Sequence, residues 1–351
     1  MLSNIISKLR IGAVAIQTVC TALPLAIVQS FAHAEEIVAS PDSGQTQGQV
    51  AGSGDPSVVH LSGDDTVGDL LSHPAFTSFA SNIMPWEDRT YDPDLPLRDF
   101  GKLLPYHSNV VADDVVGGLN HMIDDTAKGQ RVFYDFYSDA QKKVDPSLSH
   151  TGLFFFRGEP GAPFAVISPG GVFSYVGSVH EGFPYAMAIS KAGYNAFVLK
   201  YRTGRGGQIA TEDLAAALGY IFDHAEVLGV STQGYSVWGS SAGARMAAAI
   251  GSHGTEAFGR VASPKPSTVV MAYTAHSDHT SAEPPTFVVV GENDHISPPS
   301  AMTSRVEVLR ELGVQVEYHI FPDIGHGFGV GTGTSAAQWV SDAIQFWEQN
   351  F

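Results

Sequence analysis

Short apolar runs of strand length alternate with helical patterns from about Thr151 to the C-terminus. The runs lie at residues 153–156, 164–168, 196–201, 235–238, 268–273, 286–290 and 314–321. Between several of them, apolar residues recur with helical spacing, over 214–228, 302–312 and 339–347. Apolar strands that alternate with helices predict an α/β fold, a mostly parallel sheet covered by helices on both faces. Reactive groups on such a sheet gather at the carboxyl ends of the strands.

The segment from Tyr235 to Gly243 contains a G-x-S-x-G pattern where a strand should end and a helix of small residues should begin. Gly239 and Gly243 flank Ser241, and a larger residue at either position would clash with the backbone of so sharp a turn. Such a turn holds a serine hydroxyl above the sheet and aims the helix N-terminus at developing negative charge. The pattern predicts Ser241 as a nucleophile; Ser240 takes that role only if the register shifts by one residue.

A serine nucleophile requires a base, and the base requires a carboxylate that orients it. Two residues that follow strand-length runs fit these roles: Asp294, and His326 in a glycine-flanked loop. Their order along the chain, serine then aspartate then histidine, is one of the known orders for such triads. We therefore predict a triad of Ser241, Asp294 and His326, with Glu292 as the rival acid and Asp323 as a weaker one.

A tetrahedral intermediate also needs donors for its negative oxygen. Pro169-Gly170-Gly171-Val172-Phe173 follows the run 164–168, and its bare glycines let backbone N–H groups approach a substrate. We expect the oxyanion donors to be the N–H groups of Gly170, Gly171 and Ala242. A phosphate-binding loop is the alternative, but neither G-x-G-x-x-G nor G-x-x-x-x-G-K occurs here.

Three further stretches extend these motifs into a family resemblance. Pro169 to Phe173, His180-Glu181-Gly182-Phe183-Pro184 and residues 196–202 (AFVLKYR) are similar to the P-G-G-G-Y, H-E-G-x-P and A-F-V-L-x-Y-R stretches of secreted acetyl-esterase and acetyl-xylan-esterase-like proteins. The chain thus resembles the α/β-hydrolase superfamily, and this lipase/esterase group in particular, over about residues 150–351.

The resemblance implies a nucleophile at Ser241, an acid at Asp294, a base at His326 and oxyanion donors at Gly170, Gly171 and Ala242. It also implies an ester substrate with a short acyl group, acetyl foremost, on a small molecule such as an acetylated carbohydrate. Val172 stands where the family usually has a third glycine, and its branched side chain could narrow the acyl pocket. Five residues are candidates for lining that pocket: Val172, Phe173, His180, Glu181 and His276.

Composition excludes several other classes. The chain has 351 residues with 19 Lys+Arg against 36 Asp+Glu, a formal net charge of −17, which repels nucleic acids and anionic membranes. Its one cysteine, Cys20, excludes disulfide scaffolds, cysteine-ligated metals and thiol catalysis in the rest of the chain. His276 and His279 form only an isolated H-x-x-H, a weak zinc signal. We expect neither a metal nor an organic cofactor.

The N-terminal part predicts an exported protein. Residues 1–34 carry Lys8 and Arg10, an apolar run over 11–28 and an A-x-A site ending at Ala34, the pattern of a cleaved export signal rather than a membrane anchor. Residues 35–58 have the composition of a flexible tether. We predict that residues 59–150 form an extension packed on a catalytic domain at 151–351.

The sequence therefore predicts an exported serine ester hydrolase, periplasmic or secreted, with no membrane anchor after signal removal. One rival is a peptidase of the same fold that cuts short peptides. The other is a binding module that has kept the fold without its activity. The oligomeric state is not predicted.

Overall fold

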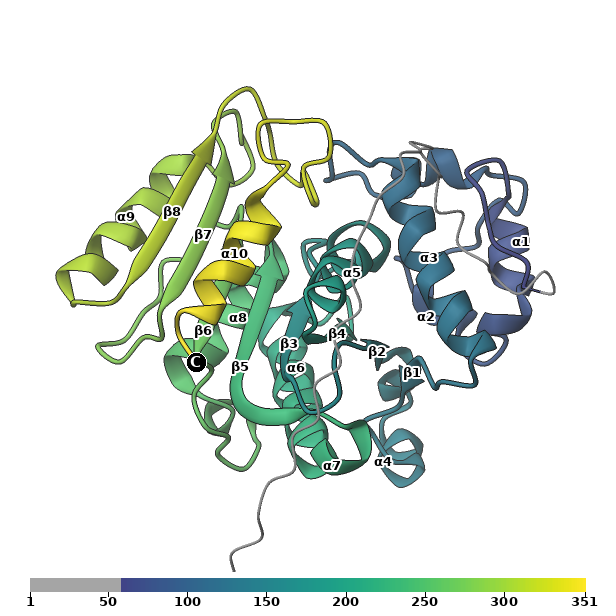
Figure 1. Cartoon of the computed structure of the whole chain (residues 1–351), viewed down its shortest axis with the longest axis horizontal. Helices are drawn as coiled ribbons and strands as arrows, with labels where there is room; N and C mark the ends of the chain where they lie inside the picture. Colours follow the sequence, from purple (N-terminus) through teal and green to yellow (C-terminus); the bar gives the residue numbers. More distant parts are fainter. Residues whose placement is uncertain (1–57) are drawn as a thin grey trace, which may run out of the picture. The chain divides into compact units, whose positions relative to one another are not determined.

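A computed structural model describes residues 58–351, which belong to one compact unit (Figure 1). Its centre is an eight-stranded sheet in the order β1-β2-β4-β3-β5-β6-β7-β8. The strands are β1 (Phe133–Tyr134), β2 (Gly152–Phe156), β3 (Pro163–Ser168), β4 (Asn195–Lys200), β5 (Ser231–Ser240), β6 (Thr268–Ala272), β7 (Thr286–Gly291) and β8 (Val316–Phe321). Strands β4, β3 and β5 to β8 run parallel, whereas β2 is antiparallel to β1 and to β4.

The predicted α/β fold is confirmed, and each predicted apolar run coincides with a strand, from β2 to β8. The sequence did not indicate β1, because two residues are too few to show a strand pattern.

The helices are α1 (Val67–Ser72), α2 (Ala80–Ile83), α3 (Ala112–Ala127), α4 (Asp139–Val144), α5 (Phe183–Lys191), α6 (Gly206–Asp223), α7 (Ala225–Leu228), α8 (Ala242–His253), α9 (Pro299–Glu311) and α10 (Trp339–Glu348). The pattern over 214–228 corresponds to two helices rather than one, because α6 ends at Asp223 and α7 begins at Ala225. Gly229 ends α7 in the left-handed conformation that favours glycine, with φ 69°.

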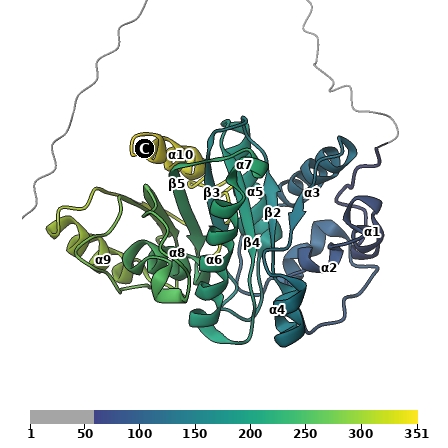
Figure 2. The ribbon, with the colours of Figure 1, turned by 90° about the horizontal axis from the view of Figure 1, so that it is seen from below.

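Helices cover both faces of the sheet, α5 and α10 on one face and α6 and α8 on the other (Figure 2). Neighbouring residues of β5 illustrate the two cores: Val237 packs with α6 and α8, and Trp238 packs with α5 and α10. Successive side chains of a strand point to opposite faces of the sheet. Because helices cover both faces, a central strand must be apolar at every position.

Most of the segment from 59 to 150 packs against the face that carries α5, whereas Phe136 belongs to the hydrophobic cluster of the other face. Phe76, Leu97 and Leu119 of this segment are buried and belong to the same hydrophobic cluster as Phe154 and Phe183 of the sheet side. Lys200 at the end of β4 also anchors this segment, since its buried Nζ donates to the Met84 carbonyl at 2.7 Å and the Pro85 carbonyl at 3.2 Å.

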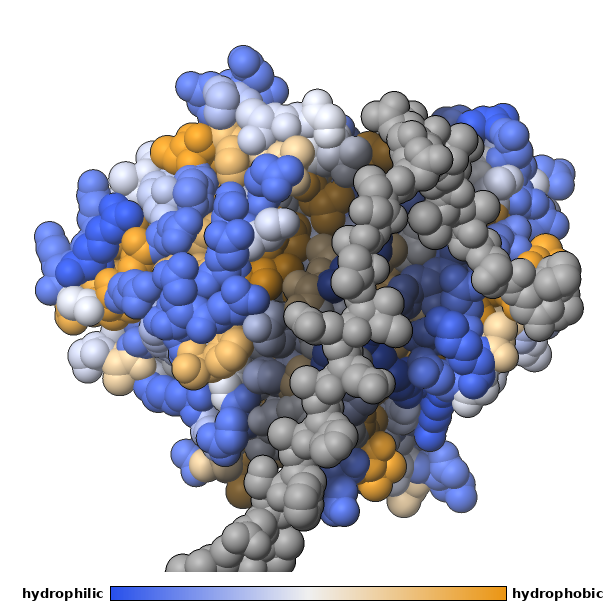
Figure 3. Space-filling view, viewed as in Figure 1, coloured by the Kyte–Doolittle hydropathy of each residue, from blue (hydrophilic) through white to orange (hydrophobic). Residues whose placement is uncertain are grey.

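The surface and the N-terminus complete the description. Hydrophilic residues predominate around α9 and α10 on the face in Figure 3, where α9 exposes Glu307, Arg310 and Glu311. Within residues 58–351, no helix combines the length and apolarity needed to cross a bilayer. The predicted export signal, Cys20 and all but the last residue of the predicted tether lie outside the described residues.

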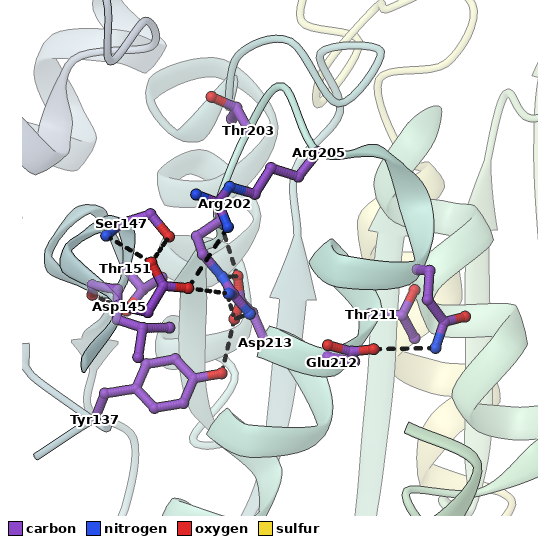
Figure 4. Close-up of polar contacts among 12 residues, drawn as sticks. Tyr137, Asp145, Ser147, Thr151, Arg202, Thr203, Arg205, Thr211, Glu212 and Asp213 are labelled. Carbon is purple, nitrogen blue, oxygen red and sulfur yellow. Dashed lines mark hydrogen bonds and ion pairs between the residues drawn. The ribbon is translucent and has the colours of Figure 1, made fainter. Parts of the chain in front are cut away.

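Asp213 has a role that the sequence pattern did not indicate. The helix α6 begins at Gly206, so Asp213 lies about two turns into it. Its buried carboxylate accepts from Arg202 Nη2 at 2.7 Å, Arg202 N at 2.8 Å and Tyr137 Oη at 2.7 Å (Figure 4). This ion pair ties the segment after β4 to α6.

Replacement of Asp213 by Asn should destabilise the protein by about 3 kcal/mol, because it leaves the buried Arg202 guanidinium only the partly exposed carboxylate of Asp145, 3.2 Å away, as countercharge. Urea unfolding at pH 7 measures the loss. The control is Arg205→Gln, which removes a half-exposed guanidinium 3.5 Å from Asp145 and should cost less than about 1 kcal/mol. Equal losses for the two variants would contradict this account of the buried pair.

Candidate active site

Ser241 lies at the sharp turn between β5 and α8, in the strained backbone conformation φ 50°, ψ −113°. A Cβ on Gly239 would overlap the Gly243 backbone, and one on Gly243 would overlap the Ser168 carbonyl. Both glycines of the motif are therefore required by the close approach of β5, α8 and the end of β3. The turn keeps Ser241 at the carboxyl edge of the sheet, at the N-terminus of α8.

The structure brings together the three residues predicted as a triad. His326 Nε2 lies 2.9 Å from Ser241 Oγ, and His326 Nδ1 lies 2.7 Å from Asp294 Oδ2. The other oxygen of Asp294 accepts from the backbone N–H groups of Ile296 at 2.9 Å and Ser297 at 2.7 Å. With the proton on Nδ1, His326 donates to Asp294, and its Nε2 is free to accept the Ser241 proton.

The rival acids are not in contact with His326. Glu292 is exposed and receives a hydrogen bond from the Asp323 N–H at 3.4 Å, and Asp323 is exposed as well. Asp294, in contrast, is only 2 % exposed. The geometry therefore favours Asp294 as the orienting carboxylate.

The loop after β3 departs from the prediction at one of its glycines. The Gly170 N–H donates to Glu181 Oε2 at 2.6 Å, so it is already paired and is not free to hold an oxyanion. Within the described part of the chain, the Gly171 N–H has no such partner, and the Ala242 N–H opens α8. The proposed donors are thus reduced to Gly171 and Ala242, and the expectation for Gly170 is wrong.

This loop carries unusual backbone strain. Gly171, Val172 and Phe173 have φ values of 137°, 54° and 58°. A Cβ on Gly171 would overlap the Tyr175 carbonyl, which explains a glycine there. Val172 occupies a conformation that a β-branched residue rarely adopts, at the position where the resembling family usually has glycine.

Glu181 is the buried centre of the polar contacts behind this loop. Besides the Gly170 N–H, its carboxylate accepts from Tyr273 Oη at 2.8 Å and lies 3.0 Å from His107 Nε2. Burial alone would raise the pKa of Glu181, but His107 and the other donors outweigh it and lower that pKa to about 2. Glu181 is thus ionised at any physiological pH and holds the oxyanion loop through Gly170.

A second set of contacts holds the loop that carries His326. Ser108 Oγ donates to the His326 carbonyl at 2.6 Å, and the Ser108 N–H donates to the Gly327 carbonyl at 3.0 Å. His180 Nε2 lies 2.9 Å from that same Gly327 carbonyl. Ser108 was not predicted as a site residue, because no local pattern links it to motifs so far along the chain.

A cavity of about 240 Å³ adjoins the serine. It is lined by Val172, Phe173, Ser241, Ala242, Arg245, Thr274, Ala275, Ile296 and Ser297.

The predicted positions of Val172 and Phe173 agree with this lining. His180 and Glu181 are buried behind the loops, so their prediction as pocket residues is wrong. His276 follows two lining residues but is not among them. Sequence analysis also missed Arg245.

The pKa of buried His180 gives a testable link to stability. Burial, and then the nearby His107, lower this pKa to about 4. As the pH falls from 6.5 to 4 the unfolded chain takes up this proton before the folded one, so the folded state loses stability in that window. The parent protein should lose unfolding free energy when the pH is lowered from 7 to 5. In His180→Gln this loss should be smaller by about 1–2 kcal/mol, because the titrating ring is absent. Urea titrations at both pH values measure it.

His279→Gln is the matched control, since His279 is exposed to water in the folded state. It should leave the difference between the two pH values unchanged. The same pH dependence in His180→Gln and in the parent protein would contradict the assignment.

Two family models match adjacent parts of the chain. The BD-FAE model matches residues 163–267, and the model of the prolyl oligopeptidase family matches residues 272–351. The first match ends just before β6 and the second begins at the last residue of β6. The first therefore covers the proposed oxyanion loop and nucleophile, and the second covers the proposed acid and base.

Similar proteins include several esterases. An acetylxylan esterase from Xylanibacter ruminicola is 23% identical in a match of 227 residues that covers 54% of this chain and 47% of that protein, so the chain spans about half the length of this curated relative. An acetyl ester-xyloside bifunctional hydrolase from Caldicellulosiruptor lactoaceticus is 20% identical, covering 62% of this chain and 95% of its own, with a TM-score of 0.53. A thermophilic esterase from Thermogutta terrifontis is 19% identical, covering 57% of this chain and 89% of its own, with a TM-score of 0.50.

The two structural likenesses confirm the fold, and the family matches cover β3 to β5 and β7 to β8 together with both motif regions. The chain therefore has the α/β-hydrolase fold that its sequence resemblance predicted, and it is similar to esterases of that fold.

Proposed function

We propose that this protein is an exported serine ester hydrolase that removes short acyl groups, acetyl foremost, from small molecules such as acetylated carbohydrates. The observation that carries the proposal is the hydrogen-bonded line from Ser241 through His326 to buried Asp294. Ser241, at the other end of this line, borders the cavity of about 240 Å³.

In the proposed acylation step, His326 Nε2 takes the proton of Ser241 as Oγ attacks the ester carbonyl carbon. Asp294 holds the ring in the required tautomer and stabilises the imidazolium that forms. The negative carbonyl oxygen accepts from the Gly171 and Ala242 N–H groups, with support from the dipole of α8. Collapse of the intermediate expels the alcohol, which receives its proton from His326.

In the proposed deacylation step, His326 removes a proton from water, which attacks the acyl group on Ser241. The second tetrahedral intermediate uses the same two donors. Its collapse returns the proton to Ser241 Oγ and releases the carboxylic acid. Each proton transfer is made by His326, so the scheme draws on no group beyond the described side chains and water.

The size of the cavity supports a short acyl group. Its volume is about 240 Å³, and Val172 extends a branched, partly exposed side chain into its lining. Acetyl-ester hydrolases are also among the similar proteins. The predicted export signal supports action outside the cytoplasm.

The match to the prolyl oligopeptidase family model over residues 272–351 favours a second candidate, a peptidase that cuts short peptides. That match covers the segment of Asp294 and His326, which serves esterases and peptidases in the same way. The choice between them therefore depends on substrate tests.

Fluorophosphonate labelling, paired with hydrolysis of p-nitrophenyl acetate, butyrate and octanoate, tests the proposal on the purified protein. Ser241→Ala should lose labelling and at least about 10³-fold in kcat while keeping the fold, because it removes the attacking oxygen. Ser240→Ala is the matched control: Ser240 Oγ donates to Tyr185 Oη and should not react.

Acetate as the fastest ester would support the short-acyl proposal, and octanoate as the fastest would contradict it. Labelling with hydrolysis of peptides but not of esters would favour the peptidase. Labelling that survives in Ser241→Ala, or no labelling at all, would overturn the catalytic scheme, the latter in favour of a binding module.

Glu181→Gln should lower kcat about 10-fold or more with little change in KM, because loss of the charge loosens the loop that presents the Gly171 N–H. Fluorophosphonate labelling should slow in parallel, since it needs the same donors. Glu292→Gln, which removes an exposed carboxylate on the same side of the sheet, should change neither rate. An unchanged kcat in Glu181→Gln would contradict the role of Glu181 in positioning the proposed oxyanion loop.

A further inference from the structure

Arg245 is the one charged residue among the nine that line the cavity beside Ser241. It lies in the first turn of α8, four residues after the serine, and is exposed to solvent. The other lining residues are apolar or carry small hydroxyl groups. A substrate bound against Ser241 therefore meets a single full charge, and that charge is positive.

The acids on neighbouring segments are engaged elsewhere. Asp278 pairs with His253 at 2.6 Å, Glu283 with Arg305 at 3.1 Å and Asp294 with His326 at 2.7 Å. Within residues 58–351, no carboxylate lies within ion-pair distance of Arg245. Four of the ten arginines in this range, Arg98, Arg202, Arg205 and Arg305, have such partners. Among the six without one, Arg245 is the arginine that lines this cavity.

The position of Arg245 on its helix is electrostatically unfavourable. The N-terminal turn of a helix carries partial positive charge and stabilises anions rather than cations. An arginine without a partner in this turn adds to the positive potential at the cavity. An anion bound next to the guanidinium would lower the positive potential that the helix turn and Arg245 together produce.

His276, the nearest other basic candidate, does not share this role. Burial, then the positive charge of Arg305, and to a smaller extent that of Arg245, lower the pKa of His276 to about 4. The ring is therefore neutral at physiological pH, and Arg245 supplies the charge.

We propose that Arg245 selects esters that carry a carboxylate, which its guanidinium binds at the rim of the cavity. This inference rests on the proposed function, since it names the class of ester cleaved. A planar guanidinium suits a carboxylate because it donates two parallel N–H bonds. In a carbohydrate ester, a uronic acid unit has this chemistry.

Exposure of Arg245 indicates which part of the substrate carries the carboxylate. Ser241 is half-buried and Arg245 is exposed, so the bound anion lies toward solvent from the reacting carbonyl. With a short acyl group, that part of the substrate is the alcohol. An acid group at the far end of a longer acyl chain is the other source of the same contact.

The test compares matched pairs of charged and neutral esters. The alcohol pair is 4-acetoxyphenylacetate and 4-acetoxyphenylacetamide; the acyl pair is p-nitrophenyl hydrogen adipate and p-nitrophenyl hexanoate. The measured quantity is the ratio of kcat/KM for the charged ester to that for the neutral one. Arg245→Gln should lower this ratio about 10-fold in one pair, and Arg245→Glu should lower it further.

Arg260→Gln is the matched control, because Arg260 lines a separate cavity and its loss removes the same charge. It should leave both ratios unchanged. A lower ratio in the alcohol pair or in the acyl pair supports the proposal and locates the carboxylate. Ratios that Arg245→Gln leaves unchanged in both pairs overturn it.

A binding measurement keeps this outcome separate from failure of the proposed function. Calorimetric titration of the Ser241→Ala protein with 4-hydroxyphenylacetate and with adipate, the charged products of the two pairs, requires no turnover. Binding of either product that weakens about 10-fold in Ser241→Ala/Arg245→Gln supports the anion site even if no ester is hydrolysed. Equal affinities of the two proteins for both products, or no binding of either product, contradict the site even where ester hydrolysis is found.

Discussion

The buried carboxylate of Glu181 requires several hydrogen-bond donors, and the segments that supply them are thereby held in place around it. One donor comes from the loop after β3, a second from Tyr273 at the end of β6, and the third position is taken by His107 from the segment that precedes the sheet. A buried charge without such partners costs several kcal/mol, so these segments hold one arrangement together. These contacts also position the loop that presents the Gly171 N–H, because the neighbouring Gly170 N–H donates to Glu181.

The segment from 59 to 150 therefore belongs to the site as well as to the core. His107 approaches Glu181, and the next residue, Ser108, holds the carbonyls of His326 and Gly327. Two neighbouring residues thus touch the supports of both the proposed oxyanion loop and the proposed base. We infer that deleting this segment would remove positioning contacts together with hydrophobic packing, which is why it is better regarded as part of the catalytic unit than as a separate attachment.

The parts that sequence predicted are those in which a short pattern fixes the geometry. An apolar run is enough to place β5, and the two glycines around Ser241 are enough to specify its turn. Asp294 and His326 follow because the topology brings the ends of parallel strands to one edge. Contacts between distant segments leave no such pattern. The Gly170 N–H was expected to face a substrate, because no local pattern shows that it donates to Glu181. The ion pair of Asp213 with Arg202 was not predicted, because the two residues come from different elements.

The residues around Ser241 are of two kinds: buried residues that position the loops, and exposed residues that line the cavity. Glu181 and Asp294 are buried and fully bonded, so they can hold loops and tautomers but cannot distinguish one substrate from another. Val172 and Arg245 are exposed in the cavity and have no such bonds to satisfy. Val172 even keeps a strained backbone, with φ 54°, at a cost of order 1–3 kcal/mol that the rigid loop must offset. A branched side chain kept at that cost, in a cavity that an arginine without an ion-pair partner also lines, is best explained by what the cavity binds. The proposed choice of substrate thus depends on residues that the shared motifs do not include.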